Sequence, residues 1–205
     1  KNSNQTLGAV EKTFDQFITD IKYVVGYISE SDALTNANST PFTTYFEKQG
    51  KAPSIIAKQN GGSEAQVFSM FEKLGKNNPN YVYVYAGDQG DGYMEWPGTY
   101  DYSEWHPKNE AWYDIAIKNP GKVVLRDAYY WEPDDAVYVS VVRSFNKGNQ
   151  IGGVAAIDVS IKTLTEMANN TKLGSSGSIM VIEDTGVILA DALNQDNNFK
   201  NVAEI

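Results

Sequence analysis

The amino-acid sequence predicts an α+β fold in which a long N-terminal helix precedes an antiparallel five-stranded sheet. Two changes of hydrophobic period predict this fold. Apolar residues near the N-terminus recur every three or four positions, which is the period of an amphipathic helix. From residue 80 onward, apolar residues alternate with polar ones, which is the period of a strand. A single helix-like segment is inserted after the second strand, and this order of elements is typical of an α+β protein.

The N-terminal segment carries an apolar stripe at heptad spacing. The members of the stripe are Leu7, Val10, Phe14, Phe17, Ile21, Val24 and Ile28. Their spacing predicts one long amphipathic helix over residues 3–31. Such a helix either packs along its own domain or acts as a signalling and dimerisation helix, and the stripe favours a combination of the two roles.

Turn-forming residues and Pro41 interrupt the helical pattern after residue 30. Two short helices are predicted next, one around Phe42–Lys48 and one around Glu64–Leu74. Gly75 follows the second helix, in a position typical of a C-terminal cap.

The sheet is predicted from segments of alternating or continuous apolar residues. The five strands are predicted at 81–86, 93–96, 122–131, 136–145 and 151–161. A helix at 108–119, closed by Pro120 and Gly121, is inserted after the second strand, and another is predicted at 162–170. A further hairpin is predicted at 174–190, turning at Asp184-Thr185-Gly186. This hairpin looks like the beginning of a second sheet of the same kind.

Composition limits the classes of function. The chain has 205 residues, a hydrophobic content of 41% and no cysteine, so it can form a core but has no disulfide, thiol nucleophile or Cys-ligated zinc. Its net charge of −9 argues against nucleic acid as a partner, because phosphate binding needs clustered Lys and Arg. No signal peptide or membrane-spanning segment is apparent. Because the sequence begins and ends within a pattern, we expect it to be a piece of a longer protein.

Catalytic motifs are scarce. His106 is the single histidine, which excludes His–His metal spacing and a Ser–His–Asp triad, and no metal or cofactor is expected. A carboxylate-pair hydrolase remains an alternative. The candidate carboxylates are Asp134, Asp135, Glu95, Glu104 and Glu110. No spacing singles out one pair, so the sequence favours binding over catalysis.

Aromatic residues other than phenylalanine gather in one part of the chain. Residues 81–131 contain all four tryptophans and nine of the thirteen tyrosines, but no phenylalanine. The same part of the chain has many carboxylates and few cationic side chains. Amphipathic rings line partly wet cavities well, and their faces attract an organic cation with about 0.5–2 kcal/mol each. An anionic ligand would need an arginine fork instead. The pattern therefore predicts a site for a small cation.

The order of these elements resembles the double Cache extracellular sensor domain of bacterial chemoreceptors and sensor histidine kinases. The segments that carry the resemblance are NEAWYDIAI, DAYYWEPDDAVYVS, GGVAAIDVSI and GSIMVIEDTGVILA. The resemblance covers nearly the whole chain. It implies PAS-like Cache modules with antiparallel five-stranded sheets and no enzymatic activity. It also implies a membrane receptor whose flanking transmembrane helices anchor an extracellular or periplasmic sensor, and a homodimer in the full receptor.

The resemblance also implies a division into three parts. Residues 1–35 correspond to the long helix, 36–170 to a complete membrane-distal ligand-binding module, and 171–205 to the start of a membrane-proximal module. The distal module holds the ligand in members of this family.

Many members of this family bind amino acids, and the resemblance implies positions for their binding residues. An arginine two residues before a Trp-Tyr pair holds the ligand carboxylate, and an aspartate on the GVxxID strand holds the amine. Trp112 and Tyr113 match the pair, and Asp158 matches the aspartate. Glu110 stands at the arginine position, so the sign of the carboxylate clamp is reversed.

Two more positions depart from the amino-acid pattern. Trp105 stands where those members have a tyrosine, and Tyr129-Tyr130-Trp131 replaces a Tyr-x-Asp. The cation-binding half of the pocket is kept, while rings and a carboxylate replace the anion-binding half. The sequence is therefore more similar to an amine-binding branch of the family.

These observations predict a sensor for a small cationic amine, including quaternary ammonium compounds such as choline. The predicted ligand-binding residues are Trp105, Glu110, Trp112, Tyr113, Tyr129, Trp131 and Asp158, with Trp96 at the hairpin end as an additional candidate. A zwitterion such as an amino acid or a betaine is the alternative, with Arg126 as a partner for its carboxylate. A pure dimerisation module built on the N-terminal helix is a third reading.

Overall fold

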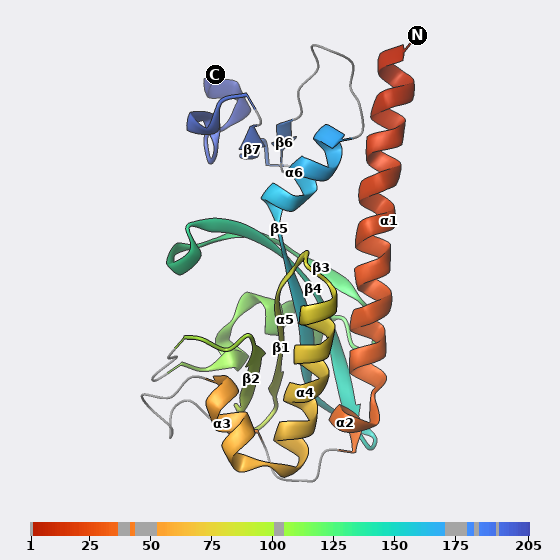
Figure 1. Ribbon diagram of the computed structural model, residues 1–205, viewed down its shortest axis with the longest axis vertical. Coiled ribbons are helices and arrows are strands. Elements are labelled where there is room, and N and C mark those ends of the chain that lie inside the picture. The colour runs from red at the N-terminus through yellow and green to blue at the C-terminus, as the bar shows by residue number, and fades with distance from the viewer. Residues whose placement is uncertain are drawn as a thin grey trace. The chain divides into compact units, whose positions relative to one another are not determined.

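The computed structural model describes most of the chain and divides it into two compact units (Figure 1). The described residues are 2–36, 42–43, 53–100, 105–170, 180–182, 185–191 and 193–205. Unit 1 consists of Lys1–Asp20, Ala128–Val139 and Ser160–Ile205, and unit 2 consists of Ile21–Asp127 and Ser140–Val159. The two units are considered one at a time below.

The N-terminal helix α1, Asn2–Glu30, confirms the predicted long helix. Val10, Ile21 and Ile28 of the predicted stripe are buried, but Val25 rather than Val24 is fully buried between them. An α-helix has about 3.6 residues per turn, so a stripe drawn at a strict heptad repeat drifts off the buried face along a straight helix. The stripe therefore follows the period of a single packed helix in this part of the chain.

Three further helices precede the sheet: α2, Asp32–Thr35; α3, Pro53–Asn60; and α4, Gly62–Asn77. The helix predicted at Glu64–Leu74 is confirmed as α4, while α3 was not predicted. Of the helix predicted at Phe42–Lys48, Phe42 and Thr43 are not helical, and the other residues lie outside the described part of the chain.

The prediction that Gly75 caps α4 is wrong. The helix continues to Asn77, and Gly75 is buried within it. A Cβ atom at Gly75 would lie 2.1 Å from the ring of Trp96. The glycine is needed because a strand tryptophan lies directly against the helix, and not because the helix ends there.

A five-stranded sheet forms the centre of the fold, as predicted, with strand order β2-β1-β5-β4-β3. Its strands are β1, Tyr81–Asp88; β2, Tyr93–Trp96; β3, Val124–Trp131; β4, Ala136–Lys147; and β5, Gln150–Ser160. The central strand β5 and its neighbour β1 are almost entirely buried, because both of their faces are covered. These two strands therefore form the interior of the sheet.

The strand register decides which side chains share a face in unit 2. Tyr85 lies opposite Glu95 on β2, and Tyr83 lies opposite Asp158 on β5, so these side chains point to one face. Val84, opposite Trp96 and Ile157, points to the other face. We call these the α5 face and the α4 face, after the helices that pack on them.

The α4 face carries the main apolar core of unit 2. Helices α3 and α4 pack against β1 and β2, and Figure 1 shows both helices alongside these strands. Side chains of α1 and α4 that are almost completely buried include Val25, Ile28, Val67 and Phe71.

The α5 face is covered by helix α5, Ala111–Lys118, and the short 3-10 helix η1, Pro107–Asn109. These two elements confirm the helix predicted at 108–119. On the α5 face, strand β1 presents tyrosines until Gly87. A Cβ atom at Gly87 would lie 3.0 Å from Pro107 and 3.1 Å from Trp112. The missing side chain allows α5 to approach the strand closely.

Unit 1 contains a small core and the predicted second hairpin. Helix α6, Ile161–Asn170, contributes Ile161 and Leu164 to a buried cluster with Val137, against which Phe14 and Phe17 of α1 pack. Strands β6, Met180–Ile182, and β7, Ile188–Asp191, pair antiparallel, and Gly186 adopts a positive φ in the turn between them. Residues 183–184 of that turn lie outside the described part of the chain.

The remaining elements are the 3-10 helices η2, Glu132–Asp134; η3, Gln195–Asn197; and η4, Val202–Glu204. Among the residues described, none of the helices has the length and apolar character needed to cross a membrane.

Candidate functional site

Asp158 is a buried carboxylate at the centre of the α5 face. Its side chain is 1% exposed, and the hydroxyl of Tyr85 donates a hydrogen bond of 2.8 Å to its Oδ1 atom. The Oγ atom of Ser140, on β4, lies 3.3 Å from the same hydroxyl. A buried charge needs such partners, and here a neutral phenol supplies one of them. The sequence predicted Asp158 as a ligand-binding residue, but it did not predict Tyr85 or Ser140 as part of the site.

Aromatic rings from β1, β2, α5 and the segment before η1 pack together next to Tyr85, the partner of Asp158. The ring centroids of Tyr85 and Trp112 are 4.9 Å apart, and those of Tyr93 and Trp105 are 4.6 Å apart, both pairs nearly perpendicular. Tyr93 also lies 6.2 Å from Trp112, which joins the two pairs. We call Tyr85, Tyr93, Trp105 and Trp112 the aromatic cluster. Edge-to-face contacts at these distances are a favourable arrangement for such rings.

Two more carboxylates are attached to the aromatic cluster. The indole Nε1 of Trp105 donates to Oε1 of Glu110 at 2.8 Å, and the hydroxyl of Tyr93 donates to Oε1 of Glu95 at 2.8 Å. Glu110 stands at the N-terminus of α5 but makes no capping hydrogen bond, since its side chain turns to Trp105. Both donors are neutral, so these hydrogen bonds orient the carboxylates without cancelling their charge.

Tyr113 follows Trp112 on α5, and the two ring centroids are 5.6 Å apart. Its side chain is only 3% exposed, and burial together with the nearby charges of Asp88 and Asp91 raises the pKa of its hydroxyl. The phenol is therefore neutral at physiological pH. Trp105, Glu110, Trp112, Tyr113 and Asp158 of the predicted set thus lie in unit 2 and are joined by ring contacts and hydrogen bonds through Tyr85 and Tyr93.

The other three predicted residues belong to the α4 face or to unit 1. Trp96 points to the α4 face and packs against Gly75, so it is separated from the aromatic cluster by the sheet. Tyr129 and Trp131 belong to unit 1. There Tyr129 contacts the ring of Tyr138, whose hydroxyl donates to Asp134 at 2.6 Å.

On β2, sequence reasoning missed Tyr93 altogether and considered Glu95 only as a candidate catalytic carboxylate, not as a ligand-binding residue. Their signal was present in the alternation of that strand, because a tyrosine and a glutamate two positions apart must share one face. In the register of this hairpin, these two side chains lie on the same face of the sheet as Tyr85.

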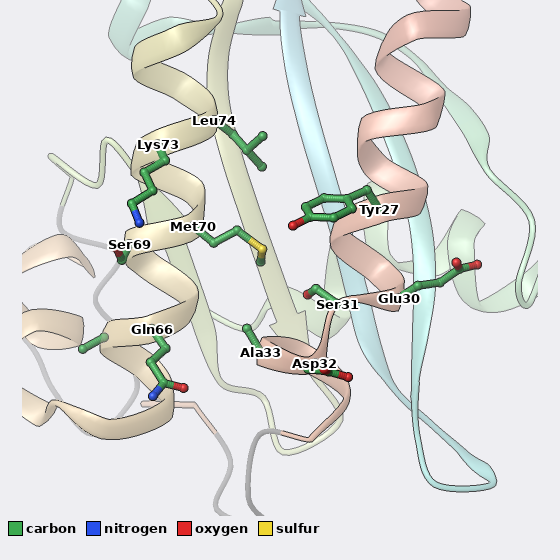
Figure 2. Close-up of a pocket in the computed structure, with 11 residues that line it drawn as sticks. Tyr27, Glu30, Ser31, Asp32, Ala33, Gln66, Ser69, Met70, Lys73 and Leu74 are labelled. Atoms are coloured by element: carbon green, nitrogen blue, oxygen red, sulfur yellow. The ribbon is translucent and has the colours of Figure 1, made fainter.

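A groove of about 910 Å³ lies away from this cluster, on the outside of α1, α2 and α4. Figure 2 shows Tyr27, Glu30 and Asp32 on one side of it and Met70, Lys73 and Leu74 of α4 on the other. None of the residues predicted to bind ligand lines this groove. Glu30 is engaged in an ion pair with Arg143, in which Nη1 lies 2.8 Å from Oε1.

Comparison with known families gives one match that covers about half of the chain. Residues 63–166 match the family described as methyl-accepting chemotaxis protein-like, first PDC sensor domain. Curated relatives include the methyl-accepting chemotaxis proteins McpB of Bacillus subtilis, 22% identical over 86% of this chain, and McpA of Pseudomonas putida, 27% identical over 62% of this chain. The aligned parts cover 24% and 19% of those two proteins, so the chain spans at most about a quarter of their length.

Solved structures similar to this chain are ligand-binding domains of chemoreceptors. They include PctC of Pseudomonas aeruginosa in complex with GABA, with a TM-score of 0.70, 19% identity, and coverage of 100% of this chain and 81% of that one. The sensory domain of Campylobacter jejuni Tlp3 with isoleucine has a TM-score of 0.68 and 15% identity, covering 97% of this chain and 74% of that one. At these identities the likeness establishes the α+β fold of the chain.

Proposed function

Because the chain belongs to the family of methyl-accepting chemotaxis protein-like first PDC sensor domains, we propose that it senses a small cationic amine for a transmembrane chemoreceptor. In this proposal the domain lies outside the cell membrane, flanking helices anchor it, and the full receptor is a homodimer. Ligand binding at the α5 face of the sheet is relayed across the membrane. The resemblance to an amine-binding branch supports the ligand class, and so does the charge of the site.

The carboxylates that contact the aromatic cluster decide which class of ligand the site favours. Asp158 and Glu95 are almost completely buried, and Glu110 is joined to Trp105 on the same face. A cation among them gains Coulomb attraction in a medium of reduced dielectric constant, and the ring faces add a quadrupole attraction. An organic anion at the same place would face three carboxylates. The site therefore favours a ligand with a positive charge.

An amino acid or a betaine is the second candidate. PctC and Tlp3 are named in complex with GABA and isoleucine, which are zwitterions. Asp158 would hold the amine of such a ligand, and a cation such as Arg126 would have to reach its carboxylate. Arg126 lies on β3, and its Nη1 atom donates to the carbonyl of Asp127 at 3.3 Å. Glu110, at the position of the family arginine, argues against a carboxylate there.

A panel of ligands in a thermal-shift assay tests this proposal. Primary to quaternary amines, including choline, are expected to raise the melting temperature, whereas acetate and succinate are not. A ligand at 100 times its dissociation constant stabilises the folded state by about 2.7 kcal/mol, which such an assay detects easily. Stabilisation by carboxylic acids that have no amino group would contradict it. Glycoside and ester substrates in the same panel address the hydrolase alternative, since a sensor leaves them unchanged.

A further inference from the structure

The hydroxyl of Tyr113 is a buried polar group that the aromatic cluster leaves unused. The side chain is 3% exposed, and its oxygen has no hydrogen-bond partner within the part of the chain that the structure describes. Leaving a buried hydroxyl unsatisfied destabilises a protein, so such a group calls for an explanation.

Two aspartates follow Gly87, where a Cβ atom would lie 3.5 Å from the Tyr113 ring: Asp88 ends β1 and Asp91 lies in the next turn, and the charges of both act on the Tyr113 hydroxyl. Asp88 is already committed to the fold, because it accepts hydrogen bonds from the backbone N–H groups of Phe42 and Gly92. Asp91 has one oxygen, Oδ2, in contact with Nδ1 of His106. Its other oxygen, Oδ1, is buried and has no hydrogen-bond partner among the described residues.

The nearby cations leave that oxygen available. Lys108 directs its Nζ atom to the carbonyl oxygen of Gln89 at 3.1 Å. Lys147 acts on Asp88, where it partly offsets the effect of burial, which raises the pKa of that carboxyl. Helix α5 thus contributes a hydroxyl and the turn a carboxylate oxygen, and neither atom has a hydrogen-bond partner among the described residues.

Trp112 connects this turn with Asp158. Its ring contacts Tyr85, the partner of Asp158, and it also contacts Tyr113. Asp158 pairs with Tyr83 on β1, whereas Trp112 and Tyr113 lie over Gly87, four residues further along the strand. At a rise of about 3.3 Å per residue, the two positions are about 13 Å apart along β1. The Trp112 ring therefore lies along β1 between the strand position that pairs with Asp158 and the turn that carries Asp91.

We propose that Tyr113 and Asp91 form a second cation subsite, so that the ligand is an extended diamine. One ammonium group meets Asp158, the alkyl chain lies against Trp112, and the other ammonium donates hydrogen bonds to Asp91 Oδ1 and the Tyr113 oxygen. An ammonium has three donors and no acceptor, which suits two acceptor oxygens at a buried position. This inference rests on the proposed function and specifies the ligand of the same site.

Calorimetric titrations with matched ligands test the second subsite. The terminal diamines of propane, butane, hexane and octane are each compared with the monoamine of the same chain length. The hexane diamine is expected to bind roughly tenfold or more tightly than hexylamine, because a second desolvated charge pair forms. The propane diamine is too short to reach both ends and should show little advantage over its monoamine.

Tyr113→Phe and Asp91→Asn are the test variants, and the ratio of diamine to monoamine affinity is the readout. In both variants the ratio is expected to fall toward one. The ligand-free Tyr113→Phe protein should melt no lower than the wild type, because it loses a hydroxyl that has no hydrogen-bond partner among the described residues. Tyr130→Phe is a matched control, since it removes a tyrosine–aspartate hydrogen bond of 2.6 Å to Asp135 at an exposed position, and it should keep the wild-type ratio.

The possible results separate the two proposals. Equal affinities of diamine and monoamine in the wild type would overturn the second subsite while leaving an amine sensor intact. A diamine advantage that persists in both test variants would place the second ammonium elsewhere and would also overturn it. If no amine bound at all, the proposed function would fail together with the inference.

Discussion

At the scale of single residues, the charge of the site depends on which groups donate hydrogen bonds to its carboxylates. Asp158, Glu95 and Glu110 each accept a hydrogen bond from a neutral phenol or indole. Such donors hold a carboxylate in place without bringing a positive charge of their own. An arginine at position 110 would instead neutralise part of this charge and would select an anion.

Glu110 offers a direct test of this reasoning. Glu110→Gln keeps an acceptor for the Trp105 indole but removes the charge, so amine affinity should fall by at least about tenfold, or about 1.4 kcal/mol. Glu110→Arg should repel amines more strongly, and it should admit amino acids if the neighbouring side chains make room for their carboxylate. Calorimetry with hexylamine and with amino acids measures both effects. Wild-type amine affinity in Glu110→Arg would show that Glu110 does not face the ligand.

At the scale of elements, close approach between a helix and a strand is set by single glycines. Gly75 accommodates Trp96 on the α4 face, and Gly87 accommodates Pro107 and Trp112 on the α5 face. Neither close approach could be predicted from periodicity. The period of a segment indicates on which face a residue lies, but not how closely a helix approaches the strand beneath it. This is why Gly75 was misread as a helix end, and why Trp96 was predicted on the side of the ligand.

Gly75→Ala tests the packing of α4 on β2. Alanine favours helix by about 1 kcal/mol over glycine, but the added methyl group would overlap the Trp96 ring, and overpacking typically costs about 1–3 kcal/mol. We expect a net loss of stability in urea unfolding. Gly8→Ala in α1 is the control, because a Cβ atom there meets nothing within 4 Å, so it should be neutral or stabilising. A gain of stability in Gly75→Ala would mean that Trp96 moves aside freely.

The second hairpin has its own dependence on pH. The pKa of Asp191 is lowered, first by the hydrogen bond from the Asn197 amide at 2.8 Å and then by the backbone N–H of Leu193. A carboxyl group whose pKa is lower in the folded state than in the unfolded state stabilises the folded state. This stabilisation is complete at pH values above the unfolded-state pKa, and it is lost as the pH falls through the folded-state pKa.

We expect the hairpin to lose stability when the pH falls below about 4, the ordinary pKa of aspartate. Asp191→Asn should weaken this dependence on pH. Amide hydrogen exchange of β7 between acidic and neutral pH measures it. Exchange in the wild type that changes no more than in Asp191→Asn would contradict the assignment to Asp191.

At the scale of the whole molecule, hydrophobic period was sufficient to predict the long helix, the five strands, the α5 segment and the second hairpin. These elements are defined by local patterns of burial. Helix α3 has only eight residues, too few to repeat a helical period, and so had no such signal. Within the site, the resemblance to the double Cache family pointed to Trp112 and Asp158, but Tyr93, Glu95 and Ser140 join them only through strand pairing. Long-range register therefore limited the prediction of the site more than local structure did.

The central claim is that this sensor domain recognises a positive charge. A calorimetric titration with hexylamine and with hexanol, which has the same chain length but no charge, tests the claim most directly. Hexylamine should bind at least about tenfold more tightly than hexanol, and Asp158→Asn should remove most of that difference. Asp114→Asn, which removes an exposed carboxylate paired with Lys118, should leave the difference unchanged. Equal affinities for the amine and the alcohol, or a difference that Asp158→Asn does not alter, would contradict the claim.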